Sequence, residues 1–284
     1  MNKFDRNRRR VKQCPCGKSN RNGKFAPYEG HEIYGYCHSC CQVFNPSQKE
    51  NTPVYIRQKP EPVSYIDDSI FKQSLAHRDN NRFYRFIAHR FNKSHADGVF
   101  EKYYVGTTDK WKGSTVFWQV DQKSKVRTGK VMLYNPNTGR RFVGCNDWIH
   151  SILLRREYLL DFNLQQCIFG LHLVDETNVN IPLAIVESEK TACIMSLISS
   201  EYIWLACGGL SALNYEKLKP VKGRKIVLFP DLGPDREKSP YVLWSQKAKA
   251  YNVLGCNISV TNQLEVRATE KQRREKWDIA DYFV

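Results

Sequence analysis

The sequence lacks long hydrophobic runs. No stretch of its 284 residues approaches the roughly 20 apolar residues that a membrane-spanning helix needs. Basic residues occur near Met1, but no apolar segment follows them as it would in a secretory signal peptide. We therefore expect a cytoplasmic protein without a membrane partner, whose 10 cysteines are thiols or metal ligands and not disulfides.

Acidic residues are scarce relative to basic ones. The 44 Lys and Arg exceed the 29 Asp and Glu, which gives a formal net charge of +15 and a pI of about 9.3. Such an excess favours a polyanionic partner, either nucleic acid or an anionic membrane surface; the alternative is a soluble protein that is merely basic. The hydrophobic content of 41% is sufficient for a folded core.

Internal repeats are also absent, and composition divides the chain into three segments. Residues 1–46 are rich in Cys, Gly and Arg and too short to bury a core of their own. Residues 47–66 are polar and spaced by prolines, which predicts an extended linker. From Asp67 onward the pattern is that of a globular domain.

The globular segment predicts two kinds of α/β structure. Its first half predicts a helical run over 69–91 and strands over 99–105, 115–120 and 130–134. Its second half predicts strands over 183–186, 202–206, 226–229 and 257–260, alternating with helices over 190–199, 213–218 and 242–251. Because these later strands are mostly apolar, they indicate a parallel sheet covered on both faces.

Two close pairs of cysteines stand in the N-terminal segment, Cys14 with Cys16 and Cys37 with Cys40. Tetrahedral zinc needs four soft ligands, and such pairs stabilise a segment that has no core. The sequence therefore predicts one structural zinc ion. The alternatives are Cys41 in place of Cys40, a contribution from His31 or His38, or four unrelated buried thiols.

The same segment combines cations with aromatic side chains. These are Arg8, Arg9, Arg10, Lys12, Phe25, Tyr28, Tyr34 and Tyr36. Because phosphates pair with cations and bases stack on rings, this composition predicts a surface for single-stranded nucleic acid.

Acidic residues follow the ends of two predicted parallel strands. Glu187 follows the strand over 183–186, and Asp231 and Asp235 follow the strand over 226–229, while Asp278 and Asp281 form a third group. Ligands of open α/β sheets bind at the carboxyl ends of strands, and carboxylates suit hard cations that bridge phosphates. A helix N-cap or a solvated turn is the alternative for each group alone. Together the three groups predict a Mg²⁺ or Mn²⁺ site.

The motifs resemble those of the Toprim family. Ile-Val-Glu-Ser-Glu-Lys-Thr-Ala at 185–192 is similar to the first Toprim motif, and Leu-Ala-Cys-Gly-Gly at 205–209 to the segment of the second strand. The strand and Asp at 226–231 resemble the approach to the Asp-x-Asp motif, and Asp-Ile-Ala-Asp at 278–281 the acidic ending of phage and mobile-element Toprim proteins.

The resemblance extends upstream, to bacterial and phage-type DNA primases. The cysteine segment is similar to primase zinc domains, and the sequences at 114–118 and 129–131 resemble strands of the primase subdomain that precedes Toprim. The sequence at 168–171 resembles the short motif just before the first Toprim strand. It implies an α/β architecture with a β-rich zinc ribbon (1–46), a linker (47–66), a primase-like catalytic subdomain (67–175) and a Toprim domain (176–284).

This resemblance implies a nucleotidyltransferase that works on single-stranded DNA and nucleotides, with structural Zn²⁺ and catalytic Mg²⁺ or Mn²⁺. Glu187 would bind metal or act as a general acid or base, and Asp231 is the best supported metal ligand. Lys190 would contact phosphate, as would Arg127, Lys130, Arg140 and Arg141.

Two departures from the family pattern keep other functions open. Ser188 replaces a glycine, and Gly233 stands where the second Asp of Asp-x-Asp is expected, which leaves Asp235 as the substitute. A Toprim nuclease and a catalytically degenerate DNA-binding module are therefore the alternatives. A Walker-type nucleotide-binding loop is missing, so a replicative helicase would be a separate chain.

Overall fold

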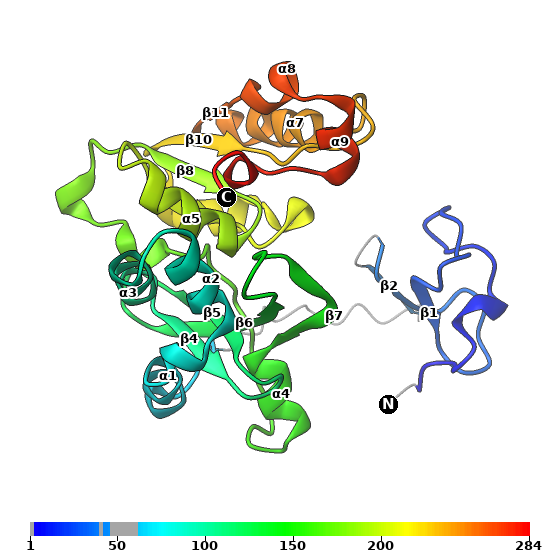
Figure 1. Cartoon of the computed structure of the whole chain (residues 1–284). Coiled ribbons are helices and arrows are strands. Elements are labelled where there is room, and N and C mark those ends of the chain that lie inside the picture. Colours follow the sequence, from blue (N-terminus) through cyan, green and yellow to red (C-terminus); the bar gives the residue numbers. More distant parts are fainter. Residues whose placement is uncertain (1–2, 40–41, 46–61) are drawn as a thin grey trace. The chain divides into compact units, whose positions relative to one another are not determined.

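A computed structural model of the chain describes residues 3–39, 42–45 and 62–284. The chain divides into two compact units, Met1–Pro60 and Glu61–Val284 (Figure 1). Most of the predicted linker, 47–61, lies outside the described residues.

The first unit is built on a small antiparallel sheet. Its strands are β1 (Phe25–Pro27), β2 (Gly35–Cys37) and β3 (Gln42–Phe44), in the order β1-β2-β3. The buried hydrophobic cluster of the described part of this unit comprises Val11, Cys14, Phe25 and Cys37. A core of this size is too small to fix the fold by apolar burial alone.

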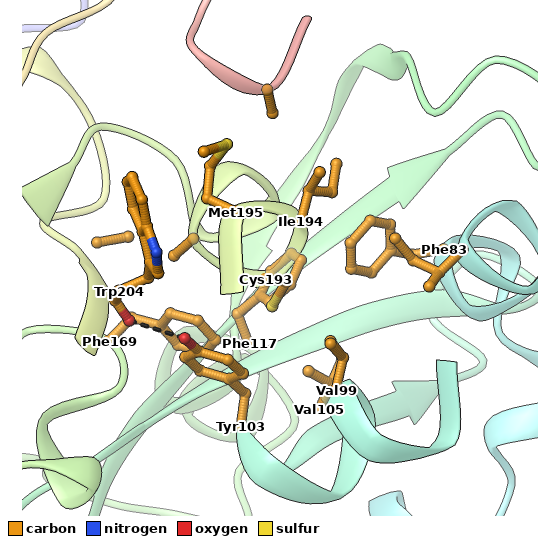
Figure 2. Close-up of a cluster of buried hydrophobic side chains, with 14 of the residues drawn as sticks. Phe83, Val99, Tyr103, Val105, Phe117, Phe169, Cys193, Ile194, Met195 and Trp204 are labelled. Carbon is orange, nitrogen blue, oxygen red and sulfur yellow. Dashed lines mark hydrogen bonds between the residues drawn. The ribbon is translucent and has the colours of Figure 1, made fainter. Parts of the chain in front are cut away.

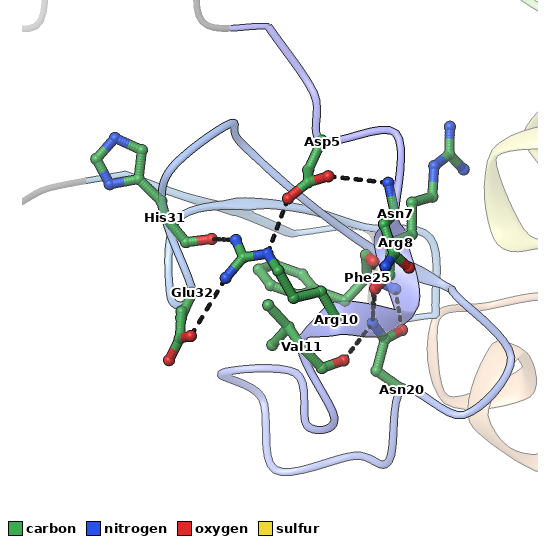
Figure 3. A network of polar contacts seen from close by, with 9 residues as sticks. All are labelled: Asp5, Asn7, Arg8, Arg10, Val11, Asn20, Phe25, His31 and Glu32. Atoms are coloured by element: carbon green, nitrogen blue, oxygen red, sulfur yellow. Dashed lines mark hydrogen bonds and ion pairs between the residues drawn. The ribbon is translucent and has the colours of Figure 1, made fainter.

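A buried asparagine joins the loops of this unit (Figure 3). The side-chain amide of Asn20 donates to the carbonyl oxygens of Arg8, Val11 and Phe25 at 2.7, 2.9 and 3.1 Å. Its Oδ1 accepts the backbone N–H of Phe25 at 2.7 Å. One side chain therefore satisfies four backbone groups of a segment that has little regular structure.

The first half of the second unit places helices beside an antiparallel sheet of order β4-β5-β6-β7. The strands are β4 (Val105–Thr108), β5 (Ser114–Val120), β6 (Val126–Tyr134) and β7 (Arg141–Trp148). The helices are α1 (Asp68–Leu75), α2 (Arg82–Arg90), α3 (Lys93–Lys102) and α4 (Ile149–Arg155).

Two predictions for this half were wrong in detail. The helical run over 69–91 is broken, because the Asn81 side chain accepts the N–H groups of Phe83 and Tyr84 and caps a new helix, α2. The predicted strand over 99–105 is mostly helix α3, which the side chain of Asn92 caps. Only Val105 of that range belongs to a strand, β4.

The second half forms the predicted parallel sheet, in the order β11-β10-β8-β9. The strands are β8 (Leu183–Val186), β9 (Ile203–Ala206), β10 (Lys225–Phe229) and β11 (Asn257–Val260). The helices are α5 (Glu189–Ile198), α6 (Tyr215–Leu218), α7 (Pro240–Val253), α8 (Gln263–Arg267) and α9 (Glu270–Glu275). The predicted α/β fold class is confirmed.

Both faces of this sheet are covered (Figure 1). Ala184 and Val186 of β8 share a buried cluster with residues of α5, whereas Leu183 and Ile185 share another with residues of α7. Such alternation is expected of a strand that is buried on both sides. Within the described ranges, no helix is both long and apolar enough to cross a membrane.

One hydrophobic core joins the two halves of the second unit (Figure 2). It includes Phe83, Phe117 and Phe169 from the first half and Trp204 from the second. Within it, the buried hydroxyl of Tyr103 donates to the backbone oxygen of Trp204 at 2.9 Å. The predicted boundary between residues 175 and 176 stays a prediction, since the core extends across it.

Candidate functional site

Glu187 and Asp231 lie at the same edge of the parallel sheet. Val186, the last residue of β8, pairs with Phe229, the last residue of β10, so the two acids leave neighbouring strands together. The backbone N–H of Asp231 donates to Oε1 of Glu187 at 3.3 Å. The register of the strands therefore brings these two predicted site residues side by side.

The segment after α9 adds two more carboxylates to this edge. The N–H of Leu232 donates to the backbone oxygen of Trp277 at 2.8 Å, which holds the segment beside Asp231. The N–H of Asp278 donates to Asp281 Oδ2 at 2.9 Å, and the N–H of Asp281 donates to Asp278 Oδ1 at 3.1 Å. The hydroxyl of Thr191 on α5 donates to Oδ2 of Asp278, which fixes the pair against the first turn of that helix.

These carboxyl groups share a site that disfavours negative charge. Burial, with a contribution from Asp278, raises the pKa of Glu187 from 4.5 to about 7. Burial and the charges of Glu187, Asp278 and Asp281 raise the pKa of Asp231 well above its usual value. Burial and then Asp278 also raise the pKa of Asp281. The four acids therefore form one electrostatically coupled cluster.

The cluster has the character of a cation site. Oδ1 of Asp231 is shielded from solvent and has no hydrogen-bond partner in the described structure. A positive group stands beside the cluster, since Nζ of Lys190 lies 4.0 Å from Oδ1 of Asp281. A divalent ion would satisfy the unpartnered oxygen and remove the repulsion between the carboxylates. The donor set, all oxygens, fits Mg²⁺ or Mn²⁺.

The loop after β10 explains the missing acid at position 233. Gly233 is buried, and a Cβ atom built on it would lie 2.7 Å from Cδ of Pro240, the first residue of α7. Asp235 is exposed, and its Oδ1 accepts the N–H groups of Glu237 and Lys238 at 2.9 and 3.2 Å. Asp235 is thus engaged in a surface turn, and it is not among the charges that raise the pKa of Glu187 or Asp231.

Lys130 occupies a buried ion pair beside the acidic cluster. Its Nζ donates to both carboxylate oxygens of Glu189, at 3.0 and 3.3 Å, and to the backbone oxygen of Gly208 at 3.0 Å. The side chains of Lys130 and Glu189 are 16% and 3% exposed. The lysine that was predicted to bind nucleotide therefore links β6 to α5 and to the loop after β9.

The other predicted basic residues of the second unit divide into two groups. Arg127 pairs with Asp121 at 2.7 Å and donates to Gln165 at 2.8 Å, which ties the β5–β6 hairpin to the segment after α4. Arg140 and Arg141 are exposed at the start of β7. Burial dominates the raised pKa of Asp281, but the charge of Arg140 opposes it, so Arg140 is within electrostatic reach of the cluster.

Three of the predicted zinc ligands lie together in the first unit. The Sγ atoms of Cys14, Cys16 and Cys37 are within 4.8 Å of one another, and this is the one such group of Cys, His, Asp or Glu atoms within the described ranges. Burial raises the pKa of Cys14 to about 12. Metal binding would remove that proton, so the group fits a metal such as zinc. Cys40 and its alternative Cys41 lie outside the described residues.

The turn between the first two cysteines is shaped for this grouping. The N–H of Gly17 donates to the backbone oxygen of Cys14 at 2.8 Å, and Gly17 has a φ of +86°. Glycine adopts this left-handed conformation without the strain of a side chain. The tight Cys-Pro-Cys spacing thereby brings two sulfur atoms to one side of the turn.

The arginines at positions 8–10 of the first unit have different surroundings. Arg10 pairs with Asp5 at 2.9 Å and Glu32 at 3.2 Å, so it stabilises the unit, whereas Arg8 points away from the polar network (Figure 3). Arg9 lines a recess of about 650 Å³ together with Lys12 and Arg21. This recess is lined by three cationic side chains, so it suits a phosphate chain.

Some residues of the site were not predicted as functional. Thr191 holds Asp278, and Glu189 holds Lys130. Both stand in the first turn of α5, directly after the predicted Glu187, so their place in the motif was visible. Their partners were not, because both contacts are long-range.

Comparison with known proteins gives one family match. The family model described as "Domain of unknown function (DUF6371)" matches residues 81–232. This range contains the antiparallel sheet, β8, β10 and the acids Glu187 and Asp231. No curated protein matches the chain.

Solved primase structures are similar in fold. The primase fragment of the bacteriophage T7 primase-helicase protein is 15% identical with a TM-score of 0.40, over 94% of this chain and 99% of that one. The RNA polymerase domain of Mycobacterium tuberculosis primase DnaG, in complex with double-stranded DNA, is 10% identical with a TM-score of 0.45, over 73% and 76%. A DnaG primase catalytic domain bound to single-stranded DNA is 12% identical with a TM-score of 0.36, over 72% and 69%.

Proposed function

The chain belongs to the DUF6371 family, and we propose that it is a primase-like nucleotidyltransferase that acts on single-stranded DNA with a divalent metal ion. The observation that carries the proposal is the cluster of Glu187, Asp231, Asp278 and Asp281 at the carboxyl edge of the parallel sheet. Their mutual repulsion and the unpartnered Oδ1 of Asp231 call for a cation at this edge.

The cluster has the groups that phosphoryl transfer needs. Mg²⁺ or Mn²⁺ held by Asp231 and its neighbours would neutralise phosphate charge and align the reacting groups. Glu187, with its pKa raised to about 7, is suited to accept a proton near neutral pH. Lys190, whose Nζ lies 4.0 Å from Oδ1 of Asp281, would contact a phosphate oxygen.

The first unit would bind the template strand. Its cysteine group would hold structural zinc, and its basic recess, with Arg9, would contact the phosphate backbone. For a single strand, the logarithm of affinity should fall with the logarithm of salt concentration by about 0.7 per neutralised phosphate.

A DNA-binding module without catalysis is the second candidate, and one observation favours it. Within the described ranges, no three acidic residues each bring a carboxylate oxygen within 4.8 Å of the other two, and Gly233 has no room for the further acid. In this second candidate the first unit would still recruit the chain to single-stranded nucleic acid.

Incubation with single-stranded DNA, labelled nucleotides and Mg²⁺ or Mn²⁺ separates these functions. Extension of a primer or new synthesis supports the proposal, cleavage of the strand indicates a nuclease, and binding without either reaction indicates the module. Asp231→Asn should abolish transfer, and Glu187→Gln should abolish it while the fold is retained. Asp109→Asn, at an exposed position outside the cluster, is the matched control and should keep full activity.

A further inference from the structure

Strand β7 contains a bulge that the proposed chemistry does not use. Met132 of β6 pairs with Asn146, and Tyr134 pairs with Arg141, so Leu133 alone faces the segment from Phe142 to Cys145. Because β7 is at the edge of its sheet, this extra backbone is pushed outward. Gly144, with a φ of +81° and no atom within 4 Å of a built Cβ, allows the chain to turn there.

The bulge leaves a hollow, which we call the β7 recess. It has a volume of about 170 Å³ and is lined by Met132, Arg141, Phe142, Val143, Gly144 and Asn146. Val143 is 96% exposed and Phe142 is 39% exposed. Apolar side chains at such exposure, on a strand edge, mark an interaction surface.

The charges around the β7 recess are positive. The guanidinium of Arg82 lies 5.8 Å from the ring centroid of Phe142, and its Nε donates to the backbone oxygen of Lys112 at 3.1 Å, which holds it over the ring. Arg140 and Arg141 are exposed beside it. The nearest acid along the strand, Asp147, is neutralised by Lys110 and Arg155.

We propose that the β7 recess binds an unstacked base of single-stranded nucleic acid, with Phe142 as the stacking surface and the arginines around it contacting the adjoining phosphates. An aromatic ring beside a basic groove is the combination by which proteins hold single strands without sequence preference. Met132, which lines the recess, shares a buried hydrophobic cluster with Ala280, the chain neighbour of Asp281. This proposal rests on the proposed function in one respect, namely that the bound single strand is the substrate.

The test is binding of a fluorescent single-stranded oligonucleotide to the full chain, measured by anisotropy. Phe142→Ala should weaken binding roughly 5- to 150-fold, the range of one lost base stack, without changing its salt dependence. Arg141→Gln should reduce the salt slope by about 0.7. Tyr158→Ala, which removes a ring that is 72% exposed on the loop after α4, is the matched control and should bind normally.

Phe142→Trp keeps a ring in place and should retain affinity, and its added fluorescence should be quenched by the oligonucleotide. Unchanged affinity of Phe142→Ala overturns the proposal. Equal quenching by a mononucleotide also overturns the proposal and indicates a site for the incoming nucleotide. If Phe142→Ala changes only the oligomeric state, the proposal is overturned in favour of a protein partner. Anisotropy measured without divalent metal reports binding apart from transfer, so failure of transfer and failure of the β7 recess are separate results.

Discussion

Gly233 shows how one residue limits the chemistry of the site. The Cβ of any larger side chain would lie 2.7 Å from Cδ of Pro240, well inside van der Waals contact. We expect Gly233→Ala to lower the free energy of unfolding by roughly 1–3 kcal/mol, as overpacking of a core does. Urea denaturation measures it. Gly98→Ala, where a built Cβ meets nothing within 4 Å, should instead be neutral or stabilising.

Glu187 makes stability depend on pH in a direction unusual for a carboxyl group. The unfolded side chain loses its proton near pH 4.5, whereas the folded one retains it to about pH 7. The native state therefore binds more protons in this interval, so its stability is complete below pH 4.5 and falls as pH rises to about 7. The raised pKa values of Asp231 and Asp281 act in the same direction.

The measurement is the thermal midpoint of metal-free protein across this interval. Glu187→Gln should flatten the decline, because a neutral amide has no proton to lose. Mg²⁺ or Mn²⁺ should raise the midpoint most at the upper end, where the carboxylates are ionised. A midpoint that rises with pH in metal-free protein would contradict the coupling of these acids.

At the scale of elements, the zinc ribbon should depend on its metal. The apolar cluster of its described part comprises four residues, so the metal has to supply most of the folding energy. We expect about one zinc per chain in protein purified without chelator, measured by elemental analysis, and loss of zinc and of ribbon structure in Cys37→Ser. Cys145→Ser, on β7, should keep its zinc. A stoichiometry near zero in the unmodified chain would refute this prediction.

The elements could be predicted where local pattern and tertiary fold agree. Strand β11 has the predicted bounds, and the apolar segments of β8 and β10 carried their acids to the predicted edge. Strand β7 was missed because its bulge breaks the alternation by which strands are identified, and Val143 is exposed where a period of two would not predict it. Helix α3 was mistaken for a strand because the cap at Asn92 was overlooked.

The side-chain contacts within the site could not be predicted from the local sequence pattern. The partner of Asp278 is Thr191, and the partner of Lys130 is Glu189, and both pairs join segments far apart in the sequence. The sequence also showed a glycine at 233 but not its cause, which is the position of Pro240. The identities of the site residues were therefore accessible, while the reasons for their arrangement were not.

At the scale of the second unit, the Lys130–Glu189 pair joins the antiparallel sheet to the parallel one. Its side chains are 16% and 3% exposed, so removal of one partner leaves a buried charge. We expect Lys130→Met to lower the free energy of unfolding by roughly 3–5 kcal/mol. Lys72→Met, which breaks the exposed pair with Asp68, should cost at most about 0.5 kcal/mol.

A double variant tests whether the loss comes from the unpaired charge. Lys130→Met combined with Glu189→Gln should recover part of the stability, because the buried carboxylate is then also neutral. Denaturant unfolding of the four proteins gives the coupling energy. If the two single changes were simply additive, the pair would not be an energetic link between the sheets.

The contact between Gly233 and Pro240 also has an evolutionary consequence. A glycine codon that ends in a pyrimidine becomes an aspartate codon by a single base change. Gly233→Asp would lower the free energy of unfolding through the contact with Pro240, so selection would disfavour it even if the new carboxylate bound metal. Gly233→Asp should therefore be tolerated better when Pro240 is replaced by a smaller residue in the same chain.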